Sequence, residues 1–161
     1  MLTKKNLLTI GISVVVTLLF IIFVAQLAVV SGSSMEPTLE DRNLVLMEKI
    51  SKEYERYDIV IAKPSNIHII KRVIGLPSET IQIIDNDIYI NDEKITDSVD
   101  VKMEDYGLAA EKITLKDNEY FVMGDNRNNS YDSRAEDLGP ITVDKIKGKV
   151  IMRIIPFKLF N

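Results

Sequence analysis

The sequence predicts a mostly β protein, in which an N-terminal transmembrane helix precedes an all-β extracytoplasmic domain of antiparallel sheets. Three observations predict this class. Residues 7–30 carry no charge, and residues beyond 42 alternate between apolar and polar in short runs. Clusters of Gly, Pro, Asn and Ser separate these runs. Many short strands joined by polar turns favour a barrel or a sandwich.

The uncharged run is long enough to cross a bilayer as a helix. Its 24 residues would extend about 36 Å, against a hydrocarbon core of about 30 Å. A buried soluble helix is one alternative, and a cleavable signal peptide is another, although the apolar part of such a peptide is normally only about 7–15 residues long. Lys4 and Lys5 precede the run, so we expect residues 1–6 in the cytoplasm and residues 31–161 outside the cell membrane, with a single pass between them.

The charge of the outer part excludes some partners. Residues 31–161 contain 18 basic and 24 acidic residues, a net charge of −6 with His neutral, which argues against nucleic acid as a partner. The chain has no cysteine, so disulfides and thiolate chemistry are excluded. Nothing in the sequence calls for a metal or an organic cofactor.

Alternation and turn residues place the expected strands. We expect strands over residues 44–47, 58–62, 67–74, 80–84, 87–90, 120–123 and 149–155. The stretch "IQIIDNDIYIN" is typical of a hairpin that turns at Asp85 and Asn86. Its acids do not follow the spacing of a helix–loop–helix calcium site, so we interpret them as a solvated turn. Residues 97–117 are expected to form a loop-rich excursion between strands.

A catalytic triad built on histidine is not expected, because His68 is the only histidine and lies in the apolar run "NIHIIKRVIG". In a strand over this run, Lys71 would share its face with Ile67, Ile69 and Val73. A lysine of ordinary pKa is neutral in only roughly one molecule in 2,500 at pH 7, but burial can lower that pKa by about 3 to 5 units. A neutral amine is a competent base for a serine hydroxyl, so Ser plus Lys forms a complete nucleophile and base pair. A lysine at a strand edge with its ammonium group in water is the alternative.

Four segments, read together, resemble one family. They are "SGSSMEPTL" (31–39), "YDIVIAK" (57–63), "IIKRVIGLP" (69–77) and "MGDNRNNSYDSR" (123–134). In this order, and behind a single N-terminal anchor, they are similar to type I signal peptidases, the membrane-bound serine peptidases that remove signal peptides from exported preproteins. The last segment is the most specific. The likeness extends over nearly the whole chain, is weakest between about 85 and 118, and is closest to the small single-anchor enzymes of Gram-positive bacteria.

The resemblance implies a role for each matching residue. It makes Ser34 the nucleophile, because the family's serine immediately precedes the methionine of "SMEPTL", and it makes Lys71 the general base. It implies that Ser130 hydrogen-bonds the lysine. Supporting residues match at Asp125, Arg127, Asp132 and Arg134, for which a solvated loop of ion pairs is the alternative. Arg72 is expected to be structural.

The resemblance also implies the substrate. The partners would be the signal peptides of exported preproteins and the lipid bilayer, and the pocket would accept small residues at the first and third positions before the cut. Met35, Ile59 and Ile61 are candidate pocket residues, with a plain core role as the alternative for Met35. A dedicated processing peptidase for one pilin or surface protein remains open. So does a non-enzymatic, membrane-tethered β module.

Two positions depart from the family pattern. Gly32 stands where some members have a serine that donates to the oxyanion, so we expect the Ser34 backbone N–H to supply one donor and an unidentified group the other. Ser78 stands where a glycine usually follows "GLP", which would strain the backbone if φ is positive there. A self-cleaving cytosolic regulator could also use Ser and Lys, but the sequence shows no DNA-binding helical domain in place of the anchor.

Overall fold

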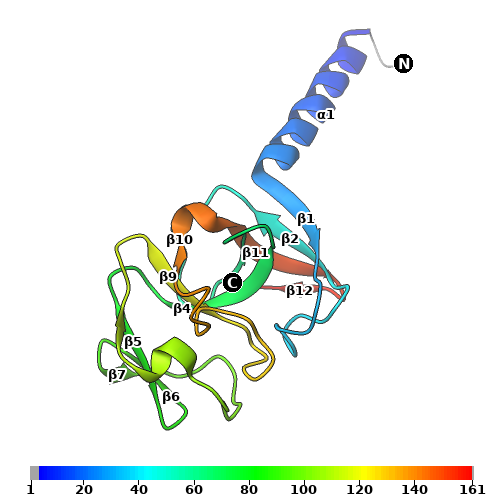
Figure 1. The fold of residues 1–161 in the computed structure, drawn as a ribbon. Helices are drawn as coiled ribbons and strands as arrows, with labels where there is room; N and C mark the ends of the chain where they lie inside the picture. The colour runs from blue at the N-terminus through cyan, green and yellow to red at the C-terminus, as the bar shows by residue number, and fades with distance from the viewer. Residues whose placement is uncertain (1–3, 161) are drawn as a thin grey trace.

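The structure is a computed structural model that describes residues 4–160, and Figure 1 shows its arrangement. One long helix stands away from a body made of two antiparallel sheets. The elements are α1 (Lys4–Val24), β1 (Ala25–Val29), β2 (Leu44–Glu48), β3 (Ile59–Ala62), β4 (Ile69–Gly75), β5 (Thr80–Ile84), β6 (Asp87–Ile90), β7 (Glu93–Lys94), η1 (Gly107–Ala110), β8 (Ile113–Thr114), β9 (Glu119–Met123), β10 (Ile141–Thr142), η2 (Val143–Lys145), β11 (Ile146–Ile155) and β12 (Lys158–Leu159).

The helix is shorter than the sequence predicted. α1 ends at Val24, and residues 25–29 instead form β1, which pairs antiparallel with β2 from Ala25 opposite Glu48 to Val29 opposite Leu44. This pairing gives the backbone of residues 25–29 new hydrogen-bond partners, so a helix over residues 7–30 is wrong. Within residues 4–160, no helix combines the length and the apolar character that a membrane crossing requires. Residues 1–3 of the expected cytoplasmic segment lie outside the described residues.

The larger sheet has eight strands in the order β1-β2-β11-β3-β4-β9-β10, with β12 paired to β11. β1 has a single neighbour in this sheet, so one edge of it is unpaired. The smaller sheet has the order β7-β6-β5-β8 and contains the predicted hairpin. Asp85 and Asn86 both have positive φ at its turn, as the favoured two-residue hairpin loop requires.

Three apolar clusters hold the sheets together. One lies between the smaller sheet and β9, and a second lies around β3, β4 and β9. The third contains Met35, Leu39, Val45 and Ile59 and packs beneath residues 30–39. Burial of this third cluster fixes the turn that follows β1, because Met35 and Leu39 are both almost completely buried.

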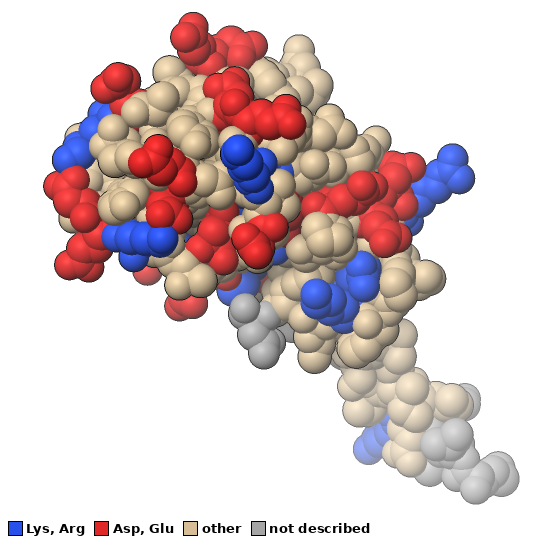
Figure 2. All heavy atoms as spheres, turned by 90° about the horizontal axis from the view of Figure 1, so that it is seen from below, with Lys and Arg blue, Asp and Glu red and all other residues tan. Residues whose placement is uncertain are grey.

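The acidic balance of the chain is visible on its surface. Figure 2 views the body from the side opposite α1, and acidic side chains crowd that face. The net charge of the whole chain is −4. The predicted excursion over residues 97–117 is confirmed as mostly irregular, with only η1 and β8 in it.

Candidate active site

Lys71 lies in the middle of β4 with its side chain directed into the protein. Alternate residues of the strand, Ile69, Lys71 and Val73, are buried, as the alternation predicted. Lys71 is only 3% exposed. Its Nζ donates to Ser34 Oγ at 2.6 Å and to the carbonyl of its neighbour Ile70 at 3.0 Å. The structure therefore brings the two predicted catalytic groups into hydrogen-bond contact.

Burial weakens the hold of Lys71 on its proton. Loss of solvation lowers the pKa of Lys71 from 10.5 to about 8, and the carboxylates of Asp132 and Asp125 only partly oppose this shift. At pH 7 about one lysine in ten is then neutral, against roughly one in 3,000 at the ordinary pKa. A neutral amine at this distance can accept the proton of the Ser34 hydroxyl.

Three residues that the sequence reasoning did not assign hold the turn that carries Ser34. The Asn126 backbone N–H donates to the Ser34 carbonyl at 3.0 Å, and its side-chain amide donates to the Ser33 carbonyl at 3.2 Å. Asn129 donates to the Ser33 hydroxyl at 3.0 Å. Gly124 passes so close that an added Cβ would lie 2.4 Å from the Ser34 carbonyl oxygen. Gly124, Asn126 and Asn129 could have been suspected from the sequence only because they lie in the "GDNRNNS" run, the most specific segment of the family resemblance.

The predicted supporting residues form buried ion pairs behind the site. Arg72, expected to be structural, donates to both carboxylate oxygens of Asp125 at 2.8 and 2.5 Å. Arg134 does the same to Asp132 at 2.9 Å for each oxygen. Although burial alone would raise the pKa of Asp132, the hydrogen bonds and charge of Arg134 hold it below its usual range. The alternative interpretation, a solvated loop of ion pairs, is therefore wrong, because these pairs are buried.

Arg127 joins this cluster to the loop at residue 97. Its guanidinium is fully buried, pairs with Asp97 and donates to the Gly124 carbonyl at 2.5 Å. The Arg127 carbonyl in turn accepts from Arg134 at 2.6 Å. The two arginines therefore fix the backbone of residues 124–134, which holds Ser34.

Ser130 differs from the expectation. Its hydroxyl is buried and has no hydrogen-bond partner within residues 4–160, and Lys71 donates to Ser34 and Ile70 instead. An added Cβ on Gly124 would lie 2.1 Å from Ser130 Oγ, so this hydroxyl packs against the strand end that also contacts Ser34. The predicted hydrogen bond from Ser130 to Lys71 is therefore absent from this conformation.

A cleft of about 700 Å³ opens beside Ser34 and Lys71. Its lining includes residues 26–31, which cover most of β1 and the two residues after it, and residues 67–71, among them His68. Met35 and Ile61 line it, as predicted. Ile59 does not line it, and its side chain packs in the third apolar cluster. His68 lies just before β4 and not in the strand.

The structure shows the conformation of Gly32 and Ser78, the two positions that depart from the family pattern. Gly32 has φ of +90°, and its N–H donates to Asp41 at 2.8 Å, so it is engaged away from the cleft. The Ser34 N–H has no hydrogen-bond acceptor among the described residues. Ser78 has φ of +66°, so the strain expected from replacing glycine is present.

Sequence comparison decides the family. The profile described as "Signal peptidase, peptidase S26" matches residues 3–155.

The chain belongs to the signal peptidase S26 family.

Named relatives from this family are similar over a little more than half of this chain. Signal peptidase I S of Bacillus subtilis (strain 168) is 38% identical over 99 residues, 57% of this chain and 54% of the relative. Signal peptidase I of Bacillus licheniformis is 39% identical over 104 residues, 58% of this chain and 56% of the relative. The chain thus spans about half the length of the curated relatives it matches. The crystal structure of a signal peptidase I from Enterococcus faecalis V583 matches with a TM-score of 0.50 and 29% identity, over 60% of this chain and 96% of that chain.

Proposed function

We propose that this member of the S26 family is a serine endopeptidase that removes N-terminal signal peptides from exported preproteins. The observation that carries the proposal is the contact of 2.6 Å between Lys71 Nζ and Ser34 Oγ at the wall of a cleft. A structural lysine would be expected to pair with a carboxylate. Here Lys71 faces a hydroxyl, while Asp125 and Asp132 are each matched by an arginine.

Acylation uses the neutral form of Lys71. The Ser34 hydroxyl donates its proton to the amine as Oγ attacks the scissile carbonyl, and a new C–O bond forms. Protonated Lys71 then gives the proton to the leaving amine, so the C–N bond breaks and the mature protein departs. The Ser34 N–H is a candidate donor to the oxyanion, since no other described group accepts from it.

Deacylation repeats the same chemistry with water. Lys71, neutral again, accepts a proton from a water molecule that attacks the acyl-enzyme carbonyl, and Ser34 Oγ leaves with a proton from Lys71. The signal peptide is then free. The family resemblance implies that the Ser130 hydroxyl would turn toward Lys71 and orient the amine during this step.

The cleft suits an extended peptide. β1 is the edge strand of its sheet and its residues line one wall, so a substrate strand can pair with its backbone. Met35 and Ile61 provide apolar contacts in this cleft. The resemblance adds a preference for small residues at the first and third positions before the cut.

Attachment to the cell membrane through α1 is part of this proposal. The described large apolar side chains of α1 are each more than half exposed, from Leu7 to Leu18, and they would be poorly solvated in water. The catalytic domain would lie on the extracytoplasmic side, where exported preproteins emerge. An enzyme held there meets substrates whose own apolar segments are in the bilayer.

Cleavage of a preprotein in detergent tests the proposal. Purified wild-type chain should release the mature protein, and Ser34→Ala and Lys71→Met should each abolish release. Ser33→Ala is the matched control, because it removes the neighbouring hydroxyl and its hydrogen bond from Asn129 without removing the nucleophile, so it should lower cleavage only severalfold. Cleavage that persists in both dyad variants would show that Ser34 and Lys71 do not catalyse it.

A further inference from the structure

Residues 30–43, between β1 and β2, carry the nucleophile, and we call them the Ser34 loop. The Asn126 backbone N–H holds this loop at the Ser34 carbonyl. Apolar packing beneath the loop resists its removal but not small shifts, whereas hydrogen bonds depend on direction and distance. The position of Ser34 therefore depends on hydrogen bonds at more than one point of the loop. Thr38, four residues beyond Ser34, is a second such point.

Two arginines from different strands bind Thr38. Arg72 donates to its hydroxyl at 3.3 Å, and Arg153 donates to its carbonyl at 3.1 Å. Arg72 directly follows Lys71 in β4, so its hydrogen bond joins the Ser34 loop to the strand that carries the base. The separation of Ser34 and Lys71 therefore depends on where Thr38 lies.

Arg153 binds neutral oxygen atoms on two segments of the chain. Besides Thr38, its guanidinium donates to the side-chain oxygen of Asn43 at 3.2 Å and to the carbonyl of Pro156 at 2.8 Å. Asn43 is buried, and the same oxygen accepts from the Glu40 N–H at 3.1 Å. The planar guanidinium thus links the Ser34 loop to the turn between β11 and β12.

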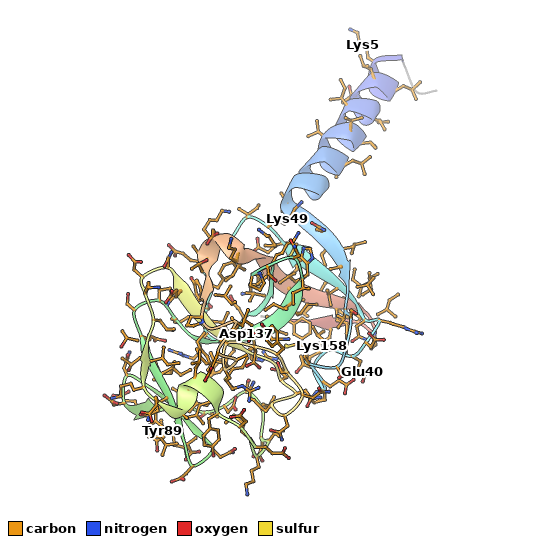
Figure 3. All side chains as sticks on the ribbon, in the orientation of Figure 1. Lys5, Glu40, Lys49, Tyr89, Asp137 and Lys158 are labelled. Carbon is orange, nitrogen blue, oxygen red and sulfur yellow. The ribbon has the colours of Figure 1, made fainter. Side chains whose placement is uncertain are left out.

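The register of β11 places Arg153 beneath the loop. It lies opposite Val45 of β2, and residues directly opposite in an antiparallel pair project from the same face of the sheet. Val45 is fully buried in the third apolar cluster, so Arg153 projects from the face that packs against the Ser34 loop. Figure 3 labels Glu40, from this loop, and Lys158, from β12, on the same side of the body.

We propose that Arg153 is a positioning residue, which holds Thr38 so that Ser34 stays within hydrogen-bond reach of Lys71. This inference rests on the proposed peptidase function and extends it to a residue outside the dyad and the cleft. Neither Arg153 nor Thr38 lines the cleft. Loss of their contact should therefore slow the chemical steps without weakening the binding of substrate.

Cleavage of a preprotein by the full chain in detergent tests the proposal. Arg153→Ala should lower kcat by at least about tenfold and change KM by less than about twofold, because a displacement of about 1 Å can cost about 100-fold in rate. The pH midpoint of the rate should stay that of the wild type, since Lys71 remains buried in β4. Arg153→Lys should give an intermediate kcat, because one ammonium group does not reproduce the planar fork.

Arg42→Ala is the matched control. Arg42 belongs to the same loop and carries the same charge, but its side chain is 91% exposed, so kcat should be unchanged. Guanidinium chloride at about 20 mM should raise the kcat of Arg153→Ala severalfold by occupying the vacated site, and sodium chloride at the same concentration should not. A residue that only stabilised the fold would lower Tm and would show no such rescue.

Alkylation of a thiol measures the same contact without peptidase activity. The chain has no cysteine, so Ser34→Cys places a single thiol beside Lys71. A nearby ammonium group stabilises the thiolate, so adding Arg153→Ala should raise the pH midpoint of alkylation by about half a unit or more. Adding Arg42→Ala should leave it unchanged. If the wild-type chain cleaves no preprotein, the proposed function fails, and this midpoint still decides the role of Arg153.

Each of four results would overturn the proposal. A kcat of Arg153→Ala within about twofold of wild type would show that the loop keeps its place without the guanidinium, and a rise in KM alone would assign Arg153 to substrate binding. Activity that guanidinium does not restore would assign the loss to the fold. An alkylation midpoint that does not move would show that other contacts set the distance to Lys71. If Arg153→Ala does not fold, Arg153→Lys decides, with an expected kcat at least about threefold below wild type.

Discussion

The dependence of cleavage on pH follows directly from the environment of Lys71. The folded pKa is about 8, and only the neutral amine acts as a base. The neutral fraction is then about 1% at pH 6, 9% at pH 7, 50% at pH 8 and 91% at pH 9. We expect kcat/KM to rise about ninetyfold between pH 6 and pH 9, with nearly all of the rise below pH 8.5.

Initial rates on a preprotein at concentrations well below KM measure this profile. The chain should be in detergent at constant ionic strength, with stability at each pH checked by returning samples to pH 8. A flat profile from pH 5 to 9 would refute the reasoning. So would a rate that still increases tenfold per pH unit above pH 9, because Lys71 would then have an ordinary pKa.

The same shift predicts a change in stability. Lys71 has a lower pKa in the folded chain than in the unfolded chain, so its charged form opposes folding at low pH. The penalty is about 3 kcal/mol below pH 8 and disappears as pH rises toward 10.5. Lys71→Met should therefore be more stable than wild type at pH 6.5 by up to about 3 kcal/mol in denaturant titrations, and equal stability would argue against a costly buried charge.

Three further variants test the support of the site and the backbone. Gly124→Ala places a Cβ against the Ser34 carbonyl and should lower cleavage by at least about 100-fold while circular dichroism stays native; full activity would mean that the turn can shift freely. Asn126→Ala removes one hydrogen bond to Ser33 and should lower kcat about fivefold with little change in KM, whereas a change in KM alone would indicate a substrate contact. Ser78→Gly relieves a positive φ and should raise Tm by about 3 °C in a thermal scan, and a lower Tm would show that the serine side chain contributes more than the strain costs.

Alternation predicted most of the sheet. The strands over residues 80–84 and 87–90 are confirmed with the predicted bounds, and the others are confirmed within a few residues. β1 was missed because its residues continue an apolar run, and only its pairing with β2 distinguishes a strand from a helix there. β7, β8, β10 and β12 have two residues each, too few for any periodic pattern.

The sequence predicted the two catalytic side chains, but it did not predict which residues around them pair with one another. The apolar neighbours of Lys71 in β4 indicated a lowered pKa for its amine. The position of Ser34 immediately before Met35 identified it as the nucleophile, and Ser34 is the serine that contacts Lys71. The pairing of Arg72 with Asp125 could not be predicted, because it joins β4 to the loop after β9, two segments that are far apart in the sequence. The same holds for Ile59, since both faces of β3 are buried and alternation does not say which one faces the cleft.

The protonation state of one side chain tests the central claim most directly. Lysines labelled with ¹³C at Cε can be titrated by NMR in the full chain in detergent micelles, with the Lys71 signal assigned by its loss in Lys71→Met. The account predicts a midpoint near pH 8, well separated from the other lysines. A midpoint near 10.5 would contradict it, because Lys71 would then carry its proton throughout the range in which Ser34 must lose one.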